Sequence, residues 1–194
     1  MRLFIYLFMG CISYQPINAQ ELQVIIGGNY NETLQEEIPN NPNFQLKGFE
    51  ANDGYQVGLC YKHNIAKKIY VGGEAGFIQK GHQNQIAVPP YHKTYYRNVY
   101  LRSTIGYSFP FGFSAELGCS LGLKPSPNHQ LLSIEKVNPT EFAFAPALRW
   151  QYQKWGLSMG YHQGITPIET LDLSGLVIHH RHRAFLLNAS YKLF

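Results

Sequence analysis

The chain has 194 residues and a formal net charge of +4; 45% of its residues are hydrophobic and only 14% are charged. This charged fraction is well below the roughly 25% of an average soluble protein. The 14 tyrosines, 12 phenylalanines and 18 glycines favour strands and tight turns over helices. The length suits a single domain, and so small a positive surplus argues neither for nor against nucleic-acid binding.

The first residues, MRLFIYLFMGCISYQPINAQ, have the layout of a secretory signal peptide. Arg2 supplies the positive start, a short apolar stretch follows, and Ala19 is a small residue at a suitable cleavage point. A lipoprotein signal cut before Cys11 fits the preceding residues less well. We therefore expect residues 1–19 to be removed and residues 20–194 to form one domain. Because export separates such a chain from nucleic acid, we expect no nucleic-acid partner.

Eight later segments alternate apolar and polar residues, which is the period of strands with one apolar face. The connections between them are alternately short, as in HNIAK, SFP and QK, and long. This indicates an antiparallel up-and-down meander, and an exported meander with strands of this length predicts an all-β, eight-stranded transmembrane barrel. The last strand must pair with the first, since a bilayer leaves no place for an open edge. The predicted strands are 22–30, 54–62, 68–80, 95–107, 111–124, 141–152, 155–165 and 182–194.

The two faces of these predicted strands differ in kind. Phe113 and Leu117, for example, alternate with Ser114 and Glu116. A soluble barrel needs its large apolar side chains inside and its charges outside. Here the charges share a face with small residues that suit a narrow lumen, so we expect the apolar face to contact lipid. A soluble secreted barrel of the lipocalin kind, holding a small apolar ligand, is the less favoured alternative.

Three residues bear on this face assignment. Pro146 falls within a predicted strand and cannot donate to the ladder, so we expect a bulge or an irregular pair there. Cys60 and Cys119 fall on non-neighbouring strands and on opposite faces, which predicts that they do not form a disulfide.

Aromatic residues cluster around the short turns. Amphipathic aromatics at one end of every strand pair predict an interfacial girdle at a membrane surface. The alternative is that these side chains merely pack on one another at strand ends. The members expected at the interface are Tyr61, Tyr70, Tyr107, Trp150, Tyr152, Trp155, Tyr191 and Phe194.

Four charged residues of alternating sign fall near the middle of four consecutive predicted strands: Glu74, Arg102, Glu116 and Arg149. Inside a narrow barrel each charge is tolerable only when it is paired and hydrogen-bonded. We therefore expect a structural charge network in a side-chain-filled lumen. A gate or proton path is the alternative, because charges within a membrane are often functional.

Histidines gather at the long-loop end, with the densest patch in HHRHR at residues 179–183. His179, His180 and His182 are weak candidates for a metal or haem site, but their spacing matches no defined metal motif, and we expect no cofactor. The sequence contains no HExxH or GxGxxG motif, and its two matches to GxSxG, GCSLG at 118–122 and GLSMG at 156–160, fall inside predicted strands and not at a strand-to-helix turn. His162 with Ser120 or Ser158 is the arrangement to consider if the barrel were a lipid-modifying enzyme.

Four stretches give the chain a resemblance to a known family: GYQVGLCYKHNIAKKIYVGGEAGFIQKG, YLRSTIGYSFPFGFSAELGCSLGLKP, YQKWGLSMGYHQGITPIE and the terminal LNASYKLF. In this order and spacing they resemble the PorT-like outer-membrane β-barrel proteins of Gram-negative, Bacteroidetes-type bacteria. Where family members usually carry a segment similar to YLEIPL, this chain has YYRNVYLRSTIGY. The resemblance implies an outer-membrane barrel, mostly of unassigned role, with a few relatives acting as accessory factors in secretion.

The sequence thus predicts a non-enzymatic barrel in the cell outer membrane. It would present outer loops for binding or adhesion, or assist envelope or secretion assembly. An outer-membrane enzyme acting on lipid or lipopolysaccharide is the alternative. The partners expected are outer-membrane lipid or lipopolysaccharide, an unknown envelope protein, and the barrel-insertion machinery, which the resemblance implies would read Phe194 at the chain end.

Overall fold

The computed structural model describes residues 20–37, 50–83, 93–123, 136–167, 169–173 and 176–194. Residues 1–19, the predicted signal peptide, lie outside these ranges. No helix within them is long and apolar enough to cross a membrane. The described elements are β1 (Gln20–Glu37), β2 (Glu50–Asn64), β3 (Ile69–Gln83), β4 (Lys93–Ser108), the 3₁₀ turn η1 (Pro110–Gly112), β5 (Phe113–Leu123), β6 (Lys136–Val137), β7 (Thr140–Phe144), β8 (Ala147–Tyr152), β9 (Trp155–Gly164), β10 (Glu169–Leu173) and β11 (Leu176–Lys192).

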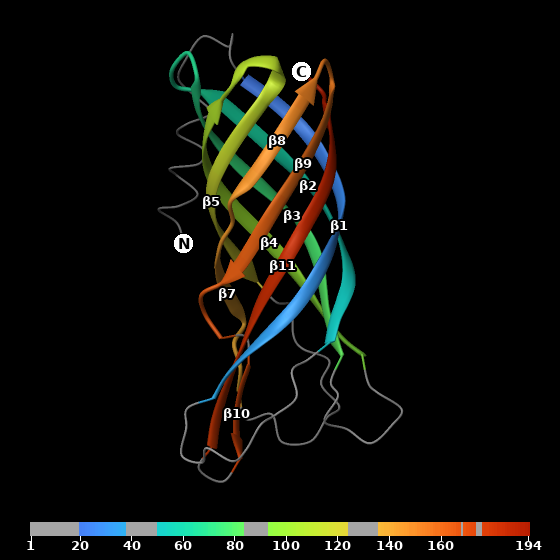
Figure 1. Ribbon diagram of the computed structural model, residues 1–194, viewed down its shortest axis with the longest axis vertical. Helices are drawn as coiled ribbons and strands as arrows, with labels where there is room; N and C mark the ends of the chain where they lie inside the picture. Colours follow the sequence, from blue (N-terminus) through green and yellow to red (C-terminus); the bar gives the residue numbers. More distant parts are fainter. Residues whose placement is uncertain (1–19, 38–49, 84–92, 124–135, 168, 174–175) are drawn as a thin grey trace.

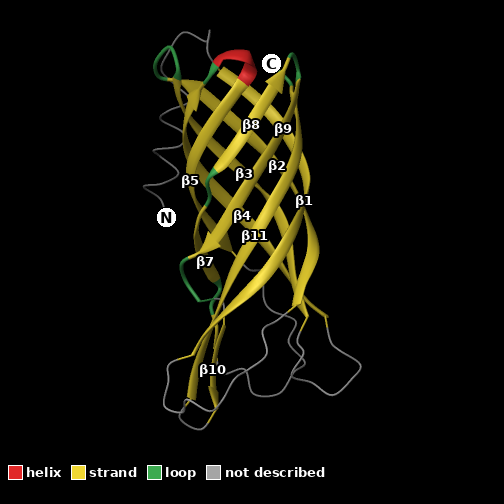
Figure 2. Cartoon of the chain, viewed as in Figure 1, coloured by secondary structure: helices red, strands yellow, loops and turns green. Residues whose placement is uncertain are grey.

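These strands form a closed antiparallel barrel (Figures 1 and 2). Each of β1 to β4 pairs with the next strand, β5 pairs with both β7 and β8, these pair with β9, and β9 pairs with β11. The ring closes where β11 pairs with β1 from Gln23 opposite Lys192 to Glu37 opposite Ile178. Counting β7 and β8 as one interrupted strand, the wall has the eight strands that the sequence predicts.

The two ends of the barrel differ. The turns between β2 and β3, η1 between β4 and β5, and Gln153–Lys154 between β8 and β9 lie at the end where the chain finishes (Figure 1). There the backbone of Leu22 bonds to that of Phe194 and Leu193, at 3.2 and 2.8 Å. At the opposite end β1 and β11 run beyond the barrel, and β10 and β6 extend this sheet. The predicted strands are therefore correct in number and order, but several are too short at this end.

Pro146 interrupts the wall between β7 and β8, which confirms the expected irregular pair. The register is nonetheless continuous, because Phe144 lies opposite Cys119 and Ala147 opposite Glu116, three residues further along both strands. Since proline has no N–H, the ladder loses bonds here without gaining an extra residue. The freed carbonyl of Ala145 instead accepts a hydrogen bond from Arg102 in the lumen.

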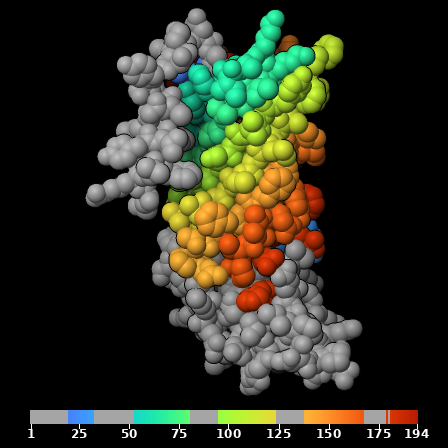
Figure 3. Space-filling model, turned by 90° about the vertical axis from the view of Figure 1, so that its left-hand side faces the viewer, coloured from blue at the N-terminus to red at the C-terminus, as the bar shows by residue number. Residues whose placement is uncertain are grey.

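The distribution of side chains is the reverse of that in a soluble protein. Lys80 and Glu141 are each only 1% exposed, whereas Leu187 and Ile26 are 65% and 64% exposed. Figure 3 shows one flank, where neighbouring strands cross the wall diagonally and their outward side chains form a continuous surface. Because large apolar side chains cover the outside of the wall while the charges lie inside, the outer face is suited to contact with hydrocarbon and not with water. The soluble lipocalin-like alternative is thereby excluded.

Glycine and tyrosine fit together inside the barrel. The Tyr70 ring occupies the space beside Gly106, where an added Cβ would lie 2.2 Å from Cζ of the ring. The Tyr100 ring lies in the same way over Gly76, at 3.0 Å from the position of a Cβ. Large inward side chains are therefore accommodated by glycines on the neighbouring strands, which is how so narrow a lumen holds so many long polar groups.

Both described cysteines are free, with Cys60 buried in the lumen and Cys119 exposed on the outer face. Their opposite directions confirm the prediction that they form no disulfide.

Candidate functional site: the polar lumen

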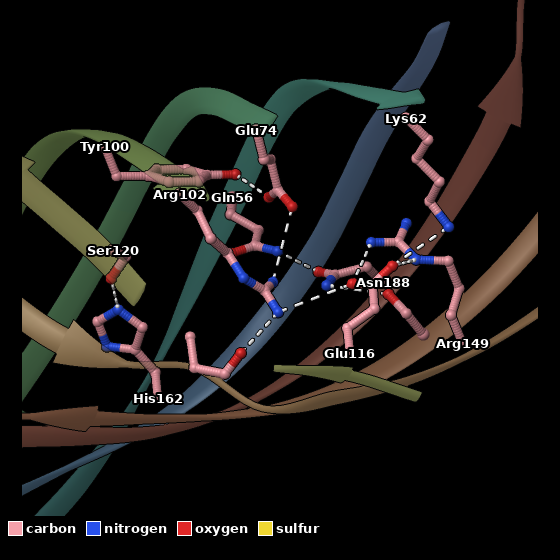
Figure 4. Close-up of polar contacts among 12 residues, drawn as sticks. Gln56, Lys62, Glu74, Tyr100, Arg102, Glu116, Ser120, Arg149, His162 and Asn188 are labelled. Atoms are coloured by element: carbon pink, nitrogen blue, oxygen red, sulfur yellow. Dashed lines mark hydrogen bonds and ion pairs between the residues drawn. The ribbon is translucent and has the colours of Figure 1, made fainter. Parts of the chain in front are cut away.

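The largest group of buried charges lies around Glu116 on β5 (Figure 4). Arg149 from β8 donates to both carboxylate oxygens, from Nε at 3.0 Å and from Nη2 at 3.1 Å. Lys62 from β2 lies 3.2 Å from Oε1, and Tyr70 from β3 donates its hydroxyl to the same oxygen at 2.8 Å. One carboxylate therefore ties four strands together through charge-assisted bonds, which are the stronger class of protein hydrogen bond.

Arg102 on β4 joins this carboxylate to a second one. Its Nη1 lies 3.6 Å from Glu74 Oε2, and its Nη2 lies 3.9 Å from Glu116 Oε2. Nη2 also donates to the carbonyl of Ala145 at 2.8 Å, and so satisfies the acceptor released by the strand interruption. Tyr100 donates its hydroxyl to Glu74.

The four residues predicted to form a charge network are thus brought together, with three further residues added by the fold. We call the whole group the central network: Lys62, Tyr70, Glu74, Tyr100, Arg102, Glu116 and Arg149.

A second group of buried polar side chains lies towards the long-loop end. Lys80 Nζ lies 2.9 Å from Glu141 Oε1 and 3.1 Å from His162 Nδ1. Asn98 donates to the other oxygen of Glu141 at 3.1 Å, and Ser120 Oγ lies 2.5 Å from His162 Nε2. We call these five residues the outer cluster. It contains a single pair of opposite full charges, and the remaining bonds are made by an amide, a hydroxyl and an imidazole.

The structure brings Ser120 and His162 together, as the enzyme alternative requires, but in the wrong protonation pattern. An ammonium has no lone pair, so Lys80 must donate to His162 Nδ1. A neutral imidazole then carries its proton on Nε2 and donates to Ser120, whereas a catalytic base must accept from the serine hydroxyl. Ser158, the other serine considered, instead accepts from Asn188 at 3.4 Å. In this arrangement His162 donates the Ser120–His162 hydrogen bond, and activation of Ser120 would require Lys80 to release Nδ1.

Between the two groups lies a cavity of about 20 Å³, lined among others by Tyr100, Arg102, Ser120 and His162. A space of this size holds one water molecule and is far smaller than the several hundred Å³ of a ligand pocket. The lumen is thus filled by side chains, as the sequence predicts for an eight-stranded barrel.

The predicted interfacial aromatics lie at the short-turn end, and most are exposed. Trp150 stacks on Tyr152 with ring centroids 6.0 Å apart, and Trp155 meets Tyr191 edge to face at 4.9 Å. The rest of this set on the outer surface comprises Tyr107 at 40% exposed, Phe194 at 68% and the half-buried Tyr61.

Tyr70 is the exception, and its predicted place at the interface is corrected. It is only 2% exposed, because it shares the parity of Gly72 and Glu74 on β3 and therefore points into the lumen. Its ring and hydroxyl belong to the central network.

The three histidines considered for a metal do not converge on one face. His182 is fully buried in the lumen and packs edge to face with Tyr96 at 5.2 Å, while alternation along β11 puts His179 on the opposite face. The side chain of His180 lies outside the described residues. Among the residues that are described, no group of three or more His, Cys, Asp or Glu is placed to hold a metal ion.

Sequence reasoning missed Lys62, Lys80 and Glu141 as lumen residues. Each lies at the first or last position of a predicted strand, where charges are normally attributed to solvent. The alternation of the strands predicts their position, because Lys80 is an even number of residues from Glu74, and Glu141 is an even number from Arg149. Each pair therefore shares the inward face.

Among the solved structures that resemble the chain over most of its length are two small outer-membrane proteins. The outer membrane protein OprG from Pseudomonas aeruginosa is 13% identical, with 90% of this chain and 96% of that chain covered and a TM-score of 0.50. Neisserial surface protein A is 10% identical, with 88% and 96% covered and a TM-score of 0.50. No protein-family model and no curated protein matches the sequence.

At these identities the likeness shows the fold. The apolar outer wall indicates that this fold is surrounded by lipid. This chain has the fold of an outer-membrane β-barrel. Its lumen network lies inside the wall, and its longer connections join strands at one end.

Proposed function

We propose that this outer-membrane barrel is a non-enzymatic and non-conducting support, which presents its long loops to the cell exterior for binding or adhesion or assists envelope or secretion assembly. The observation that carries this proposal is the central network. Its charges are paired across the lumen at 3.0 to 3.9 Å, and the cavity beside them is the size of one water molecule. A filled lumen offers no route for solutes, so the wall and its loops are the surfaces left for function.

The closed lumen is tested by electrical recording on the refolded protein in planar bilayers, with a 16-stranded porin as the positive control. We expect no stepwise current from the wild type, since eight strands leave room only for side chains. Steady unitary currents would contradict the proposal, because they require a continuous aqueous path.

The role of the loops is tested by replacing residues 38–49, 84–92 and 124–135 one at a time with short Gly-Ser linkers. Heat-modifiable gel mobility first establishes that each variant still forms the barrel. Binding to whole host cells, or recovery of a cross-linked envelope partner, should then fall for at least one replacement. Retention of all binding by all three variants would show that these three connections are not the functional surface.

Membership of the PorT-like family is part of this proposal. It is supported by the order of the four resembling stretches along the eight-stranded wall. We also propose that the insertion machinery reads the chain end, where Phe194 is 68% exposed beside the first strand. Deleting Phe194 should reduce the amount of protein in the outer-membrane fraction, while truncating the internal Phe111 side chain by Phe111→Ala should not.

The second candidate, an enzyme acting on lipid or lipopolysaccharide, is favoured by one observation, the 2.5 Å approach of Ser120 to His162. Lipid hydrolysis and acyl transfer by the purified protein test it directly. Turnover that disappears in both His162→Ala and Ser120→Ala would establish the enzyme and overturn the non-enzymatic proposal.

A further inference from the structure

The outer wall contains a hollow of about 830 Å³ that follows the direction of the strand pairing. It crosses β5, β8, β9, β11 and β1 and ends at β2; β8, β9, β11 and β1 lie side by side in the wall nearest the viewer in Figure 1. Pro146 lines the hollow at the strand interruption. Next to it, Ala147 on β8 and its partner Gly160 on β9 are small residues that add little bulk to the floor of the hollow. Gly28 lines it on β1, where an outward position carries no side chain.

The sides of this hollow are apolar and belong to the lipid-facing surface. Leu148, Met159 and Leu187 line it in one cross-strand row, and they are 58%, 60% and 65% exposed. Phe185, with Tyr161 packed against it at 5.0 Å between ring centroids, lines it in the next row towards the long-loop end. In a bilayer, a recess with these walls is filled by hydrocarbon.

A polar rim begins immediately beyond Phe185. Arg183 lies two residues further along the same face of β11, opposite Glu32 on β1, and its Nε donates to Glu32 Oε2 at 2.8 Å. Both side chains remain accessible, at 34% and 43% exposed. Tyr161 donates its hydroxyl to Gln163, which lies opposite Arg183 on β9.

This rim carries both signs of charge. Arg181 lies two residues beyond Arg183 on the same face of β11, and the exposed Asp53 lines the hollow on β2. With Glu32, the rim has two guanidinium groups on one side and two carboxylates on the other. A guanidinium binds phosphate oxygens in paired hydrogen bonds, and a carboxylate binds an ammonium group. The pattern matches a head group that is itself zwitterionic better than one that is purely anionic.

We infer that the hollow is a specific lipid site, which holds an acyl chain along Leu148, Met159 and Phe185 and seats a head group joining phosphate to an amine on the rim. The phosphate lies at Arg183 and the ammonium at the carboxylates of Glu32 and Asp53. The site lies on the outer wall, so it is separate from the lumen and from the loops that the proposed function uses. Its failure would leave the conductance and loop-replacement results unaffected.

Native mass spectrometry of the mature protein, released from detergent in the presence of phosphatidylethanolamine or phosphatidylglycerol, tests the site. We expect one phosphatidylethanolamine to be retained in preference to phosphatidylglycerol. Gly28→Phe fills the hollow without strain, because the nearest atom to an added Cβ is a carbonyl oxygen 3.8 Å away. Arg183→Gln removes the guanidinium that holds the phosphate and leaves the hollow unchanged.

Each substitution should lower retention by roughly tenfold, which corresponds to about 1.4 kcal/mol of binding free energy. Ala75→Phe is the matched control, since Ala75 is an exposed outward position on β3 that does not line the hollow, and its retention should equal that of the wild type. Equal retention of the two lipids, preference for phosphatidylglycerol, or unchanged retention in both site variants would overturn the inference. Heat-modifiable mobility confirms folding, and the two variants act at different places, so misfolding of one leaves the other decisive.

Discussion

The central network and the outer cluster are both buried in the same lumen, yet they are held together differently. In the central network three long cations converge on two carboxylates, and Glu116 alone contacts Arg149, Lys62 and Tyr70 at 3.2 Å or less. In the outer cluster one ammonium, Lys80, is shared between Glu141 and a neutral imidazole. Removing a central charge therefore leaves several opposite charges without compensation, whereas removing a hydroxyl from the outer cluster leaves one hydrogen bond unmade.

This difference shows why a narrow barrel can contain so many charges. A buried ion pair adds little stability when it is compared with an apolar replacement, but removal of one partner is severe because the other is left alone in a low dielectric. In the central network, removal of any one charged side chain therefore leaves its partners unpaired inside the lumen. The outer cluster has one such buried pair, Lys80 with Glu141, and its other members are joined by ordinary buried hydrogen bonds.

The largest effect is expected from Glu116→Gln, which keeps the shape of the side chain but leaves Arg149 and Lys62 without their carboxylate. We expect the free energy of unfolding to fall by about 3–5 kcal/mol, measured by urea titration of the refolded barrel in lipid. Glu21→Gln is the matched control, because it breaks an ion pair with Lys192 whose side chains are 30% and 31% exposed. That loss should be about 0–1 kcal/mol. Similar losses of unfolding free energy for both variants would show that buried and partly exposed ion pairs do not differ in this barrel.

Arg102→Ala should be the next most severe change. It leaves Glu74 without its cation and the Ala145 carbonyl without its hydrogen-bond donor at the strand interruption. We therefore expect the free energy of unfolding to fall by about 3 kcal/mol. Export should remain intact, because the substitution changes no outward residue. Arg97→Ala, at an exposed position of the same strand, should change stability by less than about 0.5 kcal/mol. An unchanged melting temperature in Arg102→Ala would count against the network.

Gly106→Ala tests the central network through its packing and not its charge. The added Cβ would lie 2.2 Å from the Tyr70 ring, so the ring and its bond to Glu116 must shift. We expect a loss of about 1–3 kcal/mol and altered near-ultraviolet circular dichroism from tyrosine. Gly28→Ala is the control, since the nearest atom to its added Cβ is the Gly54 carbonyl oxygen at an ordinary contact distance of 3.8 Å. Tolerance of both substitutions would show that Tyr70 is not held in place by Gly106.

The smallest effect is expected in the outer cluster, from Ser120→Ala. It removes one hydroxyl that accepts from His162, and the loss should be about 1 kcal/mol. Ser103→Ala, on the exposed face of β4, should be neutral in the same urea titration. A loss as large as that of Glu116→Gln would mean that the outer cluster is as tightly coupled as the central network.

Much of this arrangement follows from the period-two alternation of apolar and polar residues in the sequence. Alternation of side chains fixes which residues share a face, so the parity of Glu74, Arg102, Glu116 and Arg149 sufficed to place all four in the lumen. The alternation of short and long connections predicted the meander, and the missing N–H of Pro146 predicted the break in the wall. Tyr70 shows the limit of composition, because an aromatic at a strand end was assigned to the interface although its parity pointed inwards.

What parity could not supply is which inward residues meet. Partners such as Lys80 and Glu141, or Ser120 and His162, lie on strands that are not neighbours in the ring, and their meeting depends on how far the closed sheet staggers. The outer hollow likewise arises only where five strands stand side by side with small residues in register. The sequence by itself determined the topology and the two faces, since both follow from a local period of two. The tertiary structure decided the pairing of charges across the lumen, since that depends on the closure and stagger of the whole barrel.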